Sequence, residues 1–166
     1  LCRSDVLLHK LADRLPGFVA RCRARGARYS LTMPAEADAA SGQGRSWRQT
    51  LNVESKEAAE VRLASLEYEW QWLPDDAIRA TTPALPLIRH APSSKEVFFN
   101  QLIAAFCGWR DLRNEGTRSV TYGDGSAFDD DDVQSAVEIA YEQVFDLLWR
   151  SGDVALIDNY QVMHGR

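Results

Sequence analysis

Hydrophobic side chains in the first part of the chain recur every three or four residues, a spacing that predicts helix. Residues 4–26 keep this spacing, and Ser4 is placed to cap the first turn. Pro16 should break or restart the helix, and Gly26 is suited to end it. Residues 34–46 are small and polar, so we expect a loop there.

A second helical pattern covers residues 55–66. Ser55 stands where an N-cap is needed, because its hydroxyl can accept the unpaired amides of the first turn. The spacing predicts that Ala58, Val61 and Leu66 face the core.

At residues 68–72, the spacing between apolar side chains changes from about 3.6 residues to two. The aromatic residues Tyr68, Trp70 and Trp72 alternate with the polar Glu69 and Gln71. Successive side chains of a strand point to opposite faces, so this pattern predicts a half-buried strand with the aromatic residues on the buried face.

Two further apolar runs, residues 84–90 and 96–102, are separated by the turn-forming sequence APSSK and predict a hairpin. Residues 121–128, TYGDGSAF, form a turn-rich loop, and Asp124 within it is expected to serve a tight turn rather than a ligand site.

The strongest helical pattern covers residues 129–149. Four aspartates precede it and suit the positive end of the helix dipole. The side predicted to be buried consists of Val133, Val137, Ala140, Tyr141, Val144 and Leu148.

The chain closes on two predicted strands. Ser151 and Gly152 turn the chain into the apolar run 153–158, and a short strand over 161–164 then presents His164. We expect these two strands to be adjacent.

These elements predict an α+β, mainly β protein with an antiparallel core and helical insertions, in a single domain over residues 1–166. Regular alternation of strand and helix is missing from the pattern, which argues against a parallel sheet.

The composition indicates which binding partners and which cellular compartment are expected for the protein. The 166 residues carry a net charge of −5 and no long run of Lys or Arg, which argues against nucleic acid. Three cysteines, far apart and odd in number, argue against a disulfide framework or a zinc site and fit a reducing, cytoplasmic compartment. No apolar run approaches membrane-spanning length. The oligomeric state is not indicated.

Both ends of the chain suggest a piece of a longer protein. The first residue is Leu1 rather than methionine, and the last three residues, HGR, follow directly on a strand. We therefore expect that an N-terminal part and the extreme C-terminus lie outside these residues.

His164 is the candidate with the most chemical interest. A histidine at a strand end is well placed to bind a metal, because the sheet fixes the imidazole. Spacing alone favours a structural histidine instead, since no second ligand lies at zinc-like spacing. A hydrolase dyad with Asp158 lacks a nucleophile elbow.

The closing sequence WRSGDVALIDNYQVMHGR resembles the C-terminal motif of the taurine dioxygenase/TfdA-like family, in its clavaminate synthase-like branch. Four other segments resemble family segments in the same order: LPGFVARCRARGARY, GRSWRQTLNVESKEAAEVR, IRHAPSSKEVFFNQLIAAFCGW and SVTYGDG. The resemblance covers nearly the whole chain and is strongest at its end.

This resemblance implies a double-stranded β-helix, or jelly roll, that is incomplete in this chain. It also implies an iron(II)-dependent oxidoreductase that uses 2-oxoglutarate as cosubstrate and dioxygen. Iron in such enzymes is held by two histidines and one carboxylate, which leaves positions open for the cosubstrates. His164 matches the distal histidine, and we expect it to point into the mouth of the barrel. The expected reaction is hydroxylation of a small, amino-acid-like substrate.

Alternatives remain open at this point. The same fold supports halogenation and desaturation, and a non-catalytic jelly-roll binding or scaffold protein is a third interpretation. The family's proximal His-x-Asp/Glu ligands and its 2-oxoglutarate-binding arginine have no counterpart in the chain, since Arg166 belongs to the HGR motif. The 166 residues alone are therefore expected to be inactive.

Two further residues carry site hypotheses. Asn100 matches a family asparagine near the substrate, and its alternative is a hydrogen bond at a turn or a sheet edge. Trp149 is expected near the iron, and its alternative is ordinary core packing, which large aromatic side chains dominate.

Overall fold

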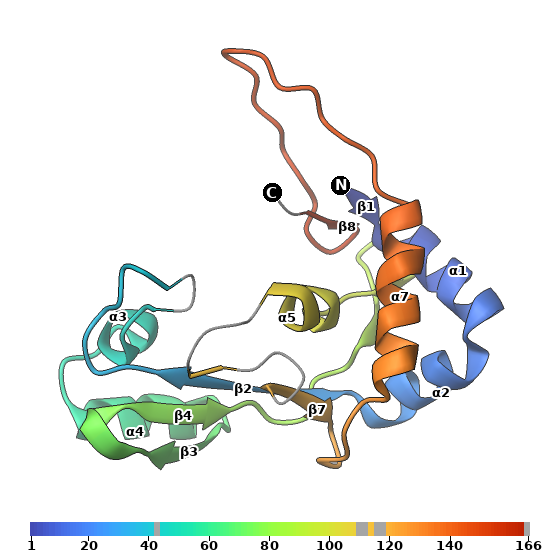
Figure 1. The fold of residues 1–166 in the computed structure, drawn as a ribbon. Helices are drawn as coiled ribbons and strands as arrows, with labels where there is room; N and C mark the ends of the chain where they lie inside the picture. The colour runs from blue at the N-terminus through green and yellow to red at the C-terminus, as the bar shows by residue number, and fades with distance from the viewer. Residues whose placement is uncertain (42–43, 109–112, 115–118, 165–166) are drawn as a thin grey trace. The chain divides into compact units, whose positions relative to one another are not determined.

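The computed structural model describes residues 1–41, 44–108, 113–114 and 119–164 (Figure 1). Its contacts divide the chain into two compact units. The first unit comprises Leu1–Gly26, Pro86–Ile103 and Asp129–Arg166, and the second comprises Ala27–Leu85 and Ala104–Phe128.

The first unit combines three helices with two small antiparallel sheets among its described residues. The helices are α1 (Ser4–Arg14), α2 (Pro16–Arg25) and α7 (Asp130–Glu142). The strands are β1 (Cys2–Arg3), β5 (Ile88–His90), β6 (Glu96–Phe98) and β8 (Val162–Met163), paired as β1–β8 and β5–β6.

The second unit is built on a four-stranded antiparallel sheet of order β3-β4-β2-β7. Its strands are β2 (Ala27–Met33), β3 (Glu69–Trp72), β4 (Ile78–Thr81) and β7 (Val120–Tyr122). Among its described residues, the unit also contains the helices α3 (Trp47–Leu51) and α4 (Lys56–Ser65) and the short 3-10 helix η1 (Pro74–Asp76). One more helix, α5 (Leu102–Gly108), includes the residues at which the two units divide.

The predicted break at Pro16 is confirmed, because Pro16 begins α2. Gly26 ends α2 with φ of 63°, a backbone conformation that glycine adopts without strain, and its N–H bonds to the carbonyl of Cys22. The cap of α1 differs from the prediction. Arg3 occupies the N-cap position, and Ser4 is the first helical residue, buried within the unit.

Helix α7 confirms one part of the prediction for 129–149 and corrects the rest. Asp129 is the N-cap, and its carboxylate accepts the amides of Asp131 and Asp132. The buried residues are Val133, Ala136, Val137, Ile139 and Ala140. The helix ends at Glu142, and the residues predicted to be buried beyond Ala140, Tyr141, Val144 and Leu148, are exposed.

The predicted hairpin is confirmed. Strands β5 and β6 pair with Ile88 opposite Phe98 and His90 opposite Glu96. The N–H of Ala91 closes the turn on the carbonyl of Lys95 at 2.8 Å. Helix α1 packs against β6, which joins the hairpin to the helices of the first unit.

The register of the large sheet separates an apolar face from a polar one. Residues directly opposite in antiparallel strands share a face, so Met33, Ile78 and Trp72 lie on one side. The other side carries Arg28 and Glu69, which form an ion pair at 2.7 Å.

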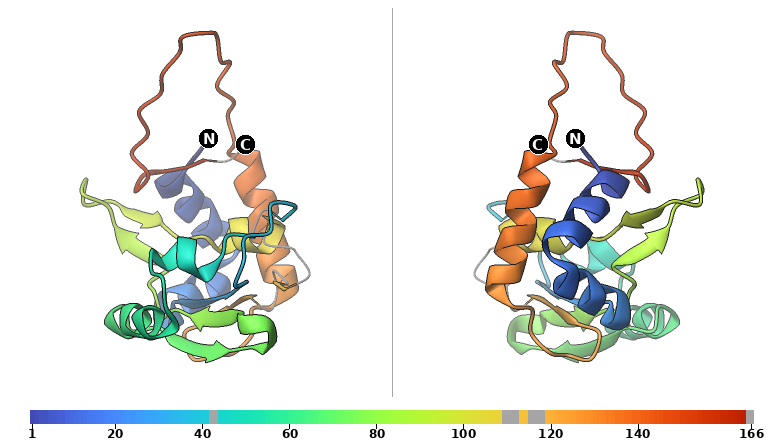
Figure 2. Two further views of the ribbon diagram at one scale, coloured as in Figure 1. Left: turned by 90° about the vertical axis from the view of Figure 1, so that its left-hand side faces the viewer. Right: turned by 90° about the vertical axis from the view of Figure 1, so that its right-hand side faces the viewer.

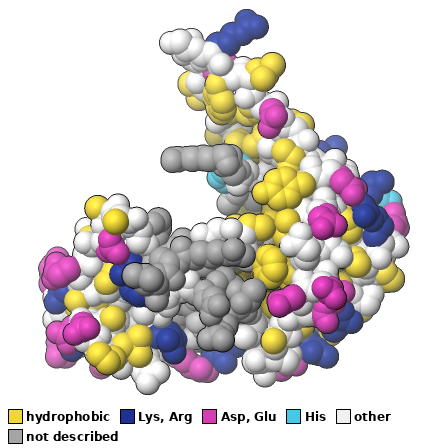
Figure 3. Space-filling view, viewed as in Figure 1, with side chains coloured by type: hydrophobic (Ala, Val, Ile, Leu, Met, Phe, Trp, Pro, Cys, Tyr) yellow, Lys and Arg dark blue, Asp and Glu magenta, His cyan; other side chains and the backbone are white. Residues whose placement is uncertain are grey.

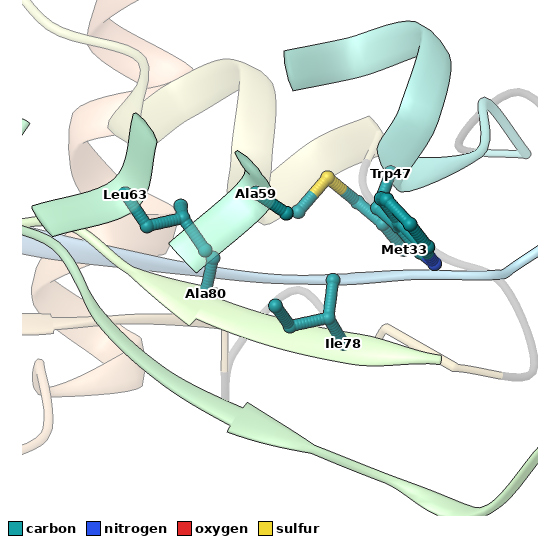
Figure 4. Close-up of a cluster of buried hydrophobic side chains, with 6 residues drawn as sticks. All are labelled: Met33, Trp47, Ala59, Leu63, Ile78 and Ala80. Atoms are coloured by element: carbon teal, nitrogen blue, oxygen red, sulfur yellow. The ribbon is translucent and has the colours of Figure 1, made fainter. Parts of the chain in front are cut away.

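Helices α3 and α4 supply the residues that bury this apolar face. The cluster consists of Met33, Trp47, Ala59, Leu63, Ile78 and Ala80 (Figure 4). The inward face of α4 is thus formed by Ala59 and Leu63, whereas the predicted Ala58, Val61 and Leu66 are exposed. The prediction of Ser55 as the N-cap is confirmed, since its hydroxyl accepts the N–H of Ala58 at 3.2 Å.

Strand β3 confirms the strand predicted at residues 68–72. The predicted burial of its aromatic side chains is only partly right. Tyr68 and Trp72 pack against the core cluster, as expected. Trp70 lies on the same side by register, opposite Ala80, yet 36% of its surface is exposed. Trp70 has β4 on one side only, because β3 is an edge strand, whereas Trp72 on the same strand is covered by Trp47, with ring centroids 5.4 Å apart.

The side chain of Asn114 hydrogen-bonds to the edge of β2 beyond Val120, the first residue of β7, where no strand pairs with β2 on that side. The amide of Asn114 accepts the N–H of Thr32 at 2.8 Å and donates to its carbonyl at 3.1 Å. Asn114 is buried, so these bonds satisfy backbone groups that water cannot reach.

Helix α3 was not predicted, because it lies next to the expected loop and spans only five residues. Ser46 and Gln49 form a capping box at its start, with Gln49 donating its N–H to the Ser46 hydroxyl at 3.2 Å. The signature S-x-x-Q is visible in the sequence and could have located it.

The architecture is therefore α+β with antiparallel sheets, as expected, but it is not mainly β, because helices hold more of the described residues than strands do. The closed jelly roll remains a prediction. Among the described residues, no helix has both the length and the apolar content needed to cross a membrane.

The two faces of α4 give a stability prediction. Leu63→Ala should lower the free energy of unfolding by about 2–5 kcal/mol, because it leaves a cavity in a fully buried cluster. Val61→Ala, two residues away and 72% exposed, should change it by less than about 0.5 kcal/mol. Chemical denaturation of both variants tests this. Equal losses would contradict the observed face of α4.

Candidate functional site

His164 is positioned by the pairing of the two ends of the described chain. Strand β8 lies antiparallel to β1, with Met163 opposite Cys2 and Val162 opposite Arg3. The N–H of Ser4 extends this ladder to the carbonyl of Gln161 at 2.8 Å. His164 is the residue directly after β8, so its backbone leaves a short but hydrogen-bonded strand.

The turn before β8 is organised by Asp158. Its carboxylate accepts the N–H of Tyr160 at 2.9 Å and the side-chain amide of Gln161 at 2.6 Å. Its carbonyl accepts the N–H groups of Gln161 and Val162 at 3.0 Å. These four bonds make Asp158 a turn-forming residue, as the Asp-Asn pair in the sequence suggested.

The immediate surroundings of His164 correct two expectations. Residues 153–158 form no strand, so β8 pairs with β1 and not with that segment. His164 is exposed, and the sheets of the described residues form no barrel around it. The physical reason is that a strand and a barrel wall need neighbouring strands, and none lies beside 153–158 within the described part of the chain.

Asn100 uses its side chain to join two elements of the chain. Its amide nitrogen donates to the carbonyl of Leu87 at 3.0 Å, and its amide oxygen accepts the N–H of Leu102 at 2.9 Å. The second bond caps the start of α5. Both bonds are of the turn type that was the alternative for this residue.

Trp149 does not join the core of the described chain. It lies after the end of α7 in an extended segment and is exposed. Ordinary core packing was the alternative for this residue, and within the described residues Trp149 takes no part in the core.

An aromatic and cationic contact, not anticipated from the sequence, fixes the turn of Asp158 on the hairpin. The rings of Phe99 and Tyr160 stack with centroids 5.0 Å apart and planes at 18°. The guanidinium of Arg89 lies 5.1 Å from the Phe99 ring and 5.6 Å from the Tyr160 ring. Tyr160 is 61 positions from Phe99 and 71 from Arg89, so periodicity carries no signal for the contact.

Asp5 forms a second group of contacts with the hairpin and with β1. Its carboxylate accepts two bonds from Arg3, at 3.0 and 2.6 Å, and lies 3.4 Å from the ammonium of Lys95. The bonds from Arg3 and, to a smaller extent, from Lys95 lower the pKa of Asp5 to about 2. Asp5 therefore connects β1, α1 and the turn of the β5–β6 hairpin.

The cysteines do not offer a thiolate ligand in the first unit. Burial raises the pKa of Cys22 to about 12 and also raises the pKa of Cys2. Asp124 serves a tight turn, as predicted, and its carboxylate accepts the N–H of Ser126 at 3.0 Å.

The described residues do not form a complete metal site. Residues 1–41, 44–108, 113–114 and 119–164 contain no group of three or more His, Cys, Asp or Glu side chains able to hold a metal ion. A single exposed imidazole at His164 does not fit a metal that needs three protein ligands. Within the described residues, the arrangement offers one ligand, fixed at the end of β8.

Comparison with known proteins gives a family match. Residues 31–166 match the family model described as "Taurine catabolism dioxygenase TauD, TfdA family". A clavaminate synthase-like protein of Arabidopsis thaliana is 34% identical over 164 residues, covering 98% of this chain and 50% of that protein. The dapdiamide synthesis protein DdaC of Enterobacter agglomerans is 29% identical over 165 residues, covering 89% of this chain and 46% of that protein. The chain thus spans about half the length of these curated relatives.

The Asp5 contacts predict a pH dependence of stability. The folded-state pKa of about 2 lies below the ordinary value of 3.8, so this carboxylate stabilises the fold above pH 4. That contribution is lost as the pH falls from about 4 to about 2. Asp5→Asn should therefore be less stable than the wild type near pH 6, and the difference should disappear near pH 2.

Denaturation curves between pH 2 and pH 6 test this prediction. Asp13→Asn on the same helix is the matched control, because Asp13 is exposed and its carboxylate lies 3.5 Å from the imidazole of His9, which is also exposed. A constant difference between wild type and Asp5→Asn across this range would show that the Asp5 ion pairs do not stabilise the fold.

Proposed function

Because the chain belongs to the TauD/TfdA family of iron(II)- and 2-oxoglutarate-dependent oxygenases, we propose that the full-length protein is such a dioxygenase. The proposed reaction is hydroxylation of a small, amino-acid-like substrate. Iron and 2-oxoglutarate, when bound, would supply the oxidising chemistry, with dioxygen as the third participant. The relatives support the family, whereas the substrate class rests on family resemblance.

His164 is the observation on which the proposal depends. It lies inside the matched region, in the motif GDVALIDNYQVMHGR, and directly follows a strand that is hydrogen-bonded to β1. Strand attachment limits the orientations of an imidazole, which a metal ligand requires. We propose His164 as one iron ligand.

The remaining ligands are proposed to come from sequence outside residues 1–166. One histidine does not make an open metal site, and the described residues hold no suitable cluster. The curated relatives are about twice as long as the matched region, which leaves room for two further ligands and for an arginine that pairs with 2-oxoglutarate. The exposure of His164 is consistent with a ring that awaits these partners.

We propose that residues 1–166 are the central and C-terminal part of one jelly-roll domain. The antiparallel sheets support this reading, and the family match over residues 31–166 supports it further. In the proposed domain, Asn100 positions the hairpin next to the substrate through its bonds to Leu87 and Leu102. Trp149 would lie near the iron once its exposed ring is covered.

The main test is His164→Ala in the full-length protein. This change should abolish iron-dependent release of succinate from 2-oxoglutarate and lower the iron content, because no adjacent side chain can replace the imidazole. The melting temperature of the metal-free protein should change little, because the side chain is exposed. Succinate assays and metal analysis on the same preparations measure both effects.

His9→Ala is the matched control. His9 is also exposed, but it lies on α1 away from the proposed motif. This variant should retain full turnover and iron content. Normal turnover and iron content in His164→Ala would exclude His164 as a ligand, and no turnover in the wild type with any candidate substrate would count against the oxygenase itself.

A second test uses the 166 residues alone. With iron(II), ascorbate and 2-oxoglutarate, this chain should release no more succinate than a sample without protein, because it contributes one proposed ligand. Clear enzymatic succinate formation would mean that a complete ligand set lies within residues 1–166.

A further inference from the structure

Two aromatic side chains attach the turn before His164 to the β5–β6 hairpin. The rings of Phe99 and Tyr160 stack with centroids 5.0 Å apart, and the guanidinium of Arg89 lies 5.1 and 5.6 Å from the two ring centroids. We call these three side chains the Tyr160 stack. Both views of Figure 2 show the turn before β8, in red, beside the hairpin, in yellow-green. The stack therefore joins two segments that are far apart in the sequence.

The place of Tyr160 in the chain connects the stack to His164. Tyr160 lies in the turn that Asp158 organises, four residues before His164. The next residue, Gln161, begins the ladder with β1, because its carbonyl accepts the N–H of Ser4 at 2.8 Å. The chain from Tyr160 to His164 is thus held at its start by stacked rings and along β8 by backbone hydrogen bonds.

Phe99 belongs to a well-bonded part of the hairpin. It follows β6 directly, and its N–H donates to the carbonyl of Leu87 at 3.1 Å. The side-chain amide of Asn100 donates to the same carbonyl at 3.0 Å. Beside the stack, the hydroxyl of Ser93 donates to the side-chain oxygen of Gln161 at 3.3 Å. The turn before β8 therefore rests on backbone that is itself held by hydrogen bonds.

The segment that enters this turn gives it no comparable support within the described residues. Residues 153–158 form no strand, Val154 is 94% exposed and Leu156 is 100% exposed. Figure 3 shows hydrophobic side chains at the surface of the segment between α7 and β8. The direction in which the chain enters β8 is therefore set by the turn of Asp158 and by the Tyr160 stack.

The β1–β8 ladder by itself holds His164 weakly. The ladder pairs Cys2 with Met163 and Arg3 with Val162, and His164 lies just beyond its last pair. Residues at the end of so short a ladder open readily, because few hydrogen bonds must break. A functional side chain must be held within about 0.5 Å of its productive position. A contact besides the ladder is needed to fix this segment, and the Tyr160 stack lies where such a contact would act.

We propose that Tyr160 is a positioning residue for His164, because its ring, held on Phe99, fixes the path of residues 158–164 along the hairpin. The inference rests on the proposed role of His164 as an iron ligand. Tyr160 acts through the backbone of the segment and is not itself a ligand. Since the contact is made by the rings, the effect requires the ring of Tyr160 and not its hydroxyl.

Amide exchange in the metal-free full-length protein tests the positioning by itself. The N–H groups of Gln161 and Val162 bond to the carbonyl of Asp158 at 3.0 Å. In Tyr160→Ala, these two amides should exchange about 10-fold or more faster than in the wild type, whereas the amides of α2 should be unchanged. Tyr160→Phe keeps the stacked ring and should exchange like the wild type. Tyr141→Ala, which removes an exposed tyrosine of α7, is the matched control and should also leave both amides unchanged.

The affinity for iron(II), measured on the same full-length proteins without oxygen, is the second readout. Loss of a residue that orients a metal ligand lowers metal affinity by about 10–100-fold. Tyr160→Ala should therefore raise the dissociation constant at least about 10-fold, and Tyr160→Phe should bind iron like the wild type. Phe99→Leu should cause the same loss as Tyr160→Ala, and the double variant should be little worse than either, because the two rings act as a pair.

The outcomes distinguish this role from the proposed function. Unchanged exchange in both Tyr160→Ala and Phe99→Leu would overturn the positioning role. Faster exchange with wild-type iron affinity would also overturn it, because the stack would then serve the fold alone. Equal losses in Tyr160→Phe and Tyr160→Ala would assign the effect to the hydroxyl and contradict the stack. Normal iron content in His164→Ala would instead refute the proposed function, a result that the Tyr160 variants cannot produce. If Tyr160→Ala does not fold, Phe99→Leu decides.

Discussion

Backbone N–H and C=O groups that leave water must find hydrogen-bond partners, and this requirement determines which apolar segments of the chain become strands. Strand β2 has β4 on one side and β7 on the other, and the amide of Asn114 takes over where β7 ends. Strand β8 is two residues long because β1 offers only two residues to pair with. Residues 153–158 have the strongest strand composition near the end of the chain, yet they remain irregular without a partner.

The sequence was sufficient to predict those helix ends and turns that depend on a few neighbouring residues. Ser55, Pro16 and Gly26 mark helix ends through backbone chemistry, and the β5–β6 hairpin follows from two apolar runs and a turn. The inward face of α4 could not be predicted reliably. Ala58 and Ala59 are adjacent, and the position of the sheet decides which of them is buried. The same holds for Trp70, whose exposure reflects its place on an edge strand.

The candidate site likewise has a part that could be predicted from the sequence and a part that could not. The motif around His164 is contiguous, so the sequence could single out His164 as a candidate and predict the turn before it. Its support is assembled from distant segments: Asp5 joins Arg3 to Lys95, and Tyr160 stacks on Phe99. No periodicity relates these residues, so only the folded chain brings them together. For Asn100, the sequence motif suggested a match to a family residue, but it gave no information on the hydrogen bonds that the side-chain amide makes to Leu87 and Leu102.

The pairing of β1 with β8 has a consequence for the order of folding. The contacts between Leu1 and Phe145 close a loop of 144 positions, and the β1–β8 ladder closes a longer one. Contacts between such distant residues form slowly, because much chain entropy is lost before they contribute. During synthesis, α1, α2 and the four-stranded sheet can form while residues 1–3 still lack their partner. The backbone that carries His164 is therefore among the last parts of the chain to take its final position.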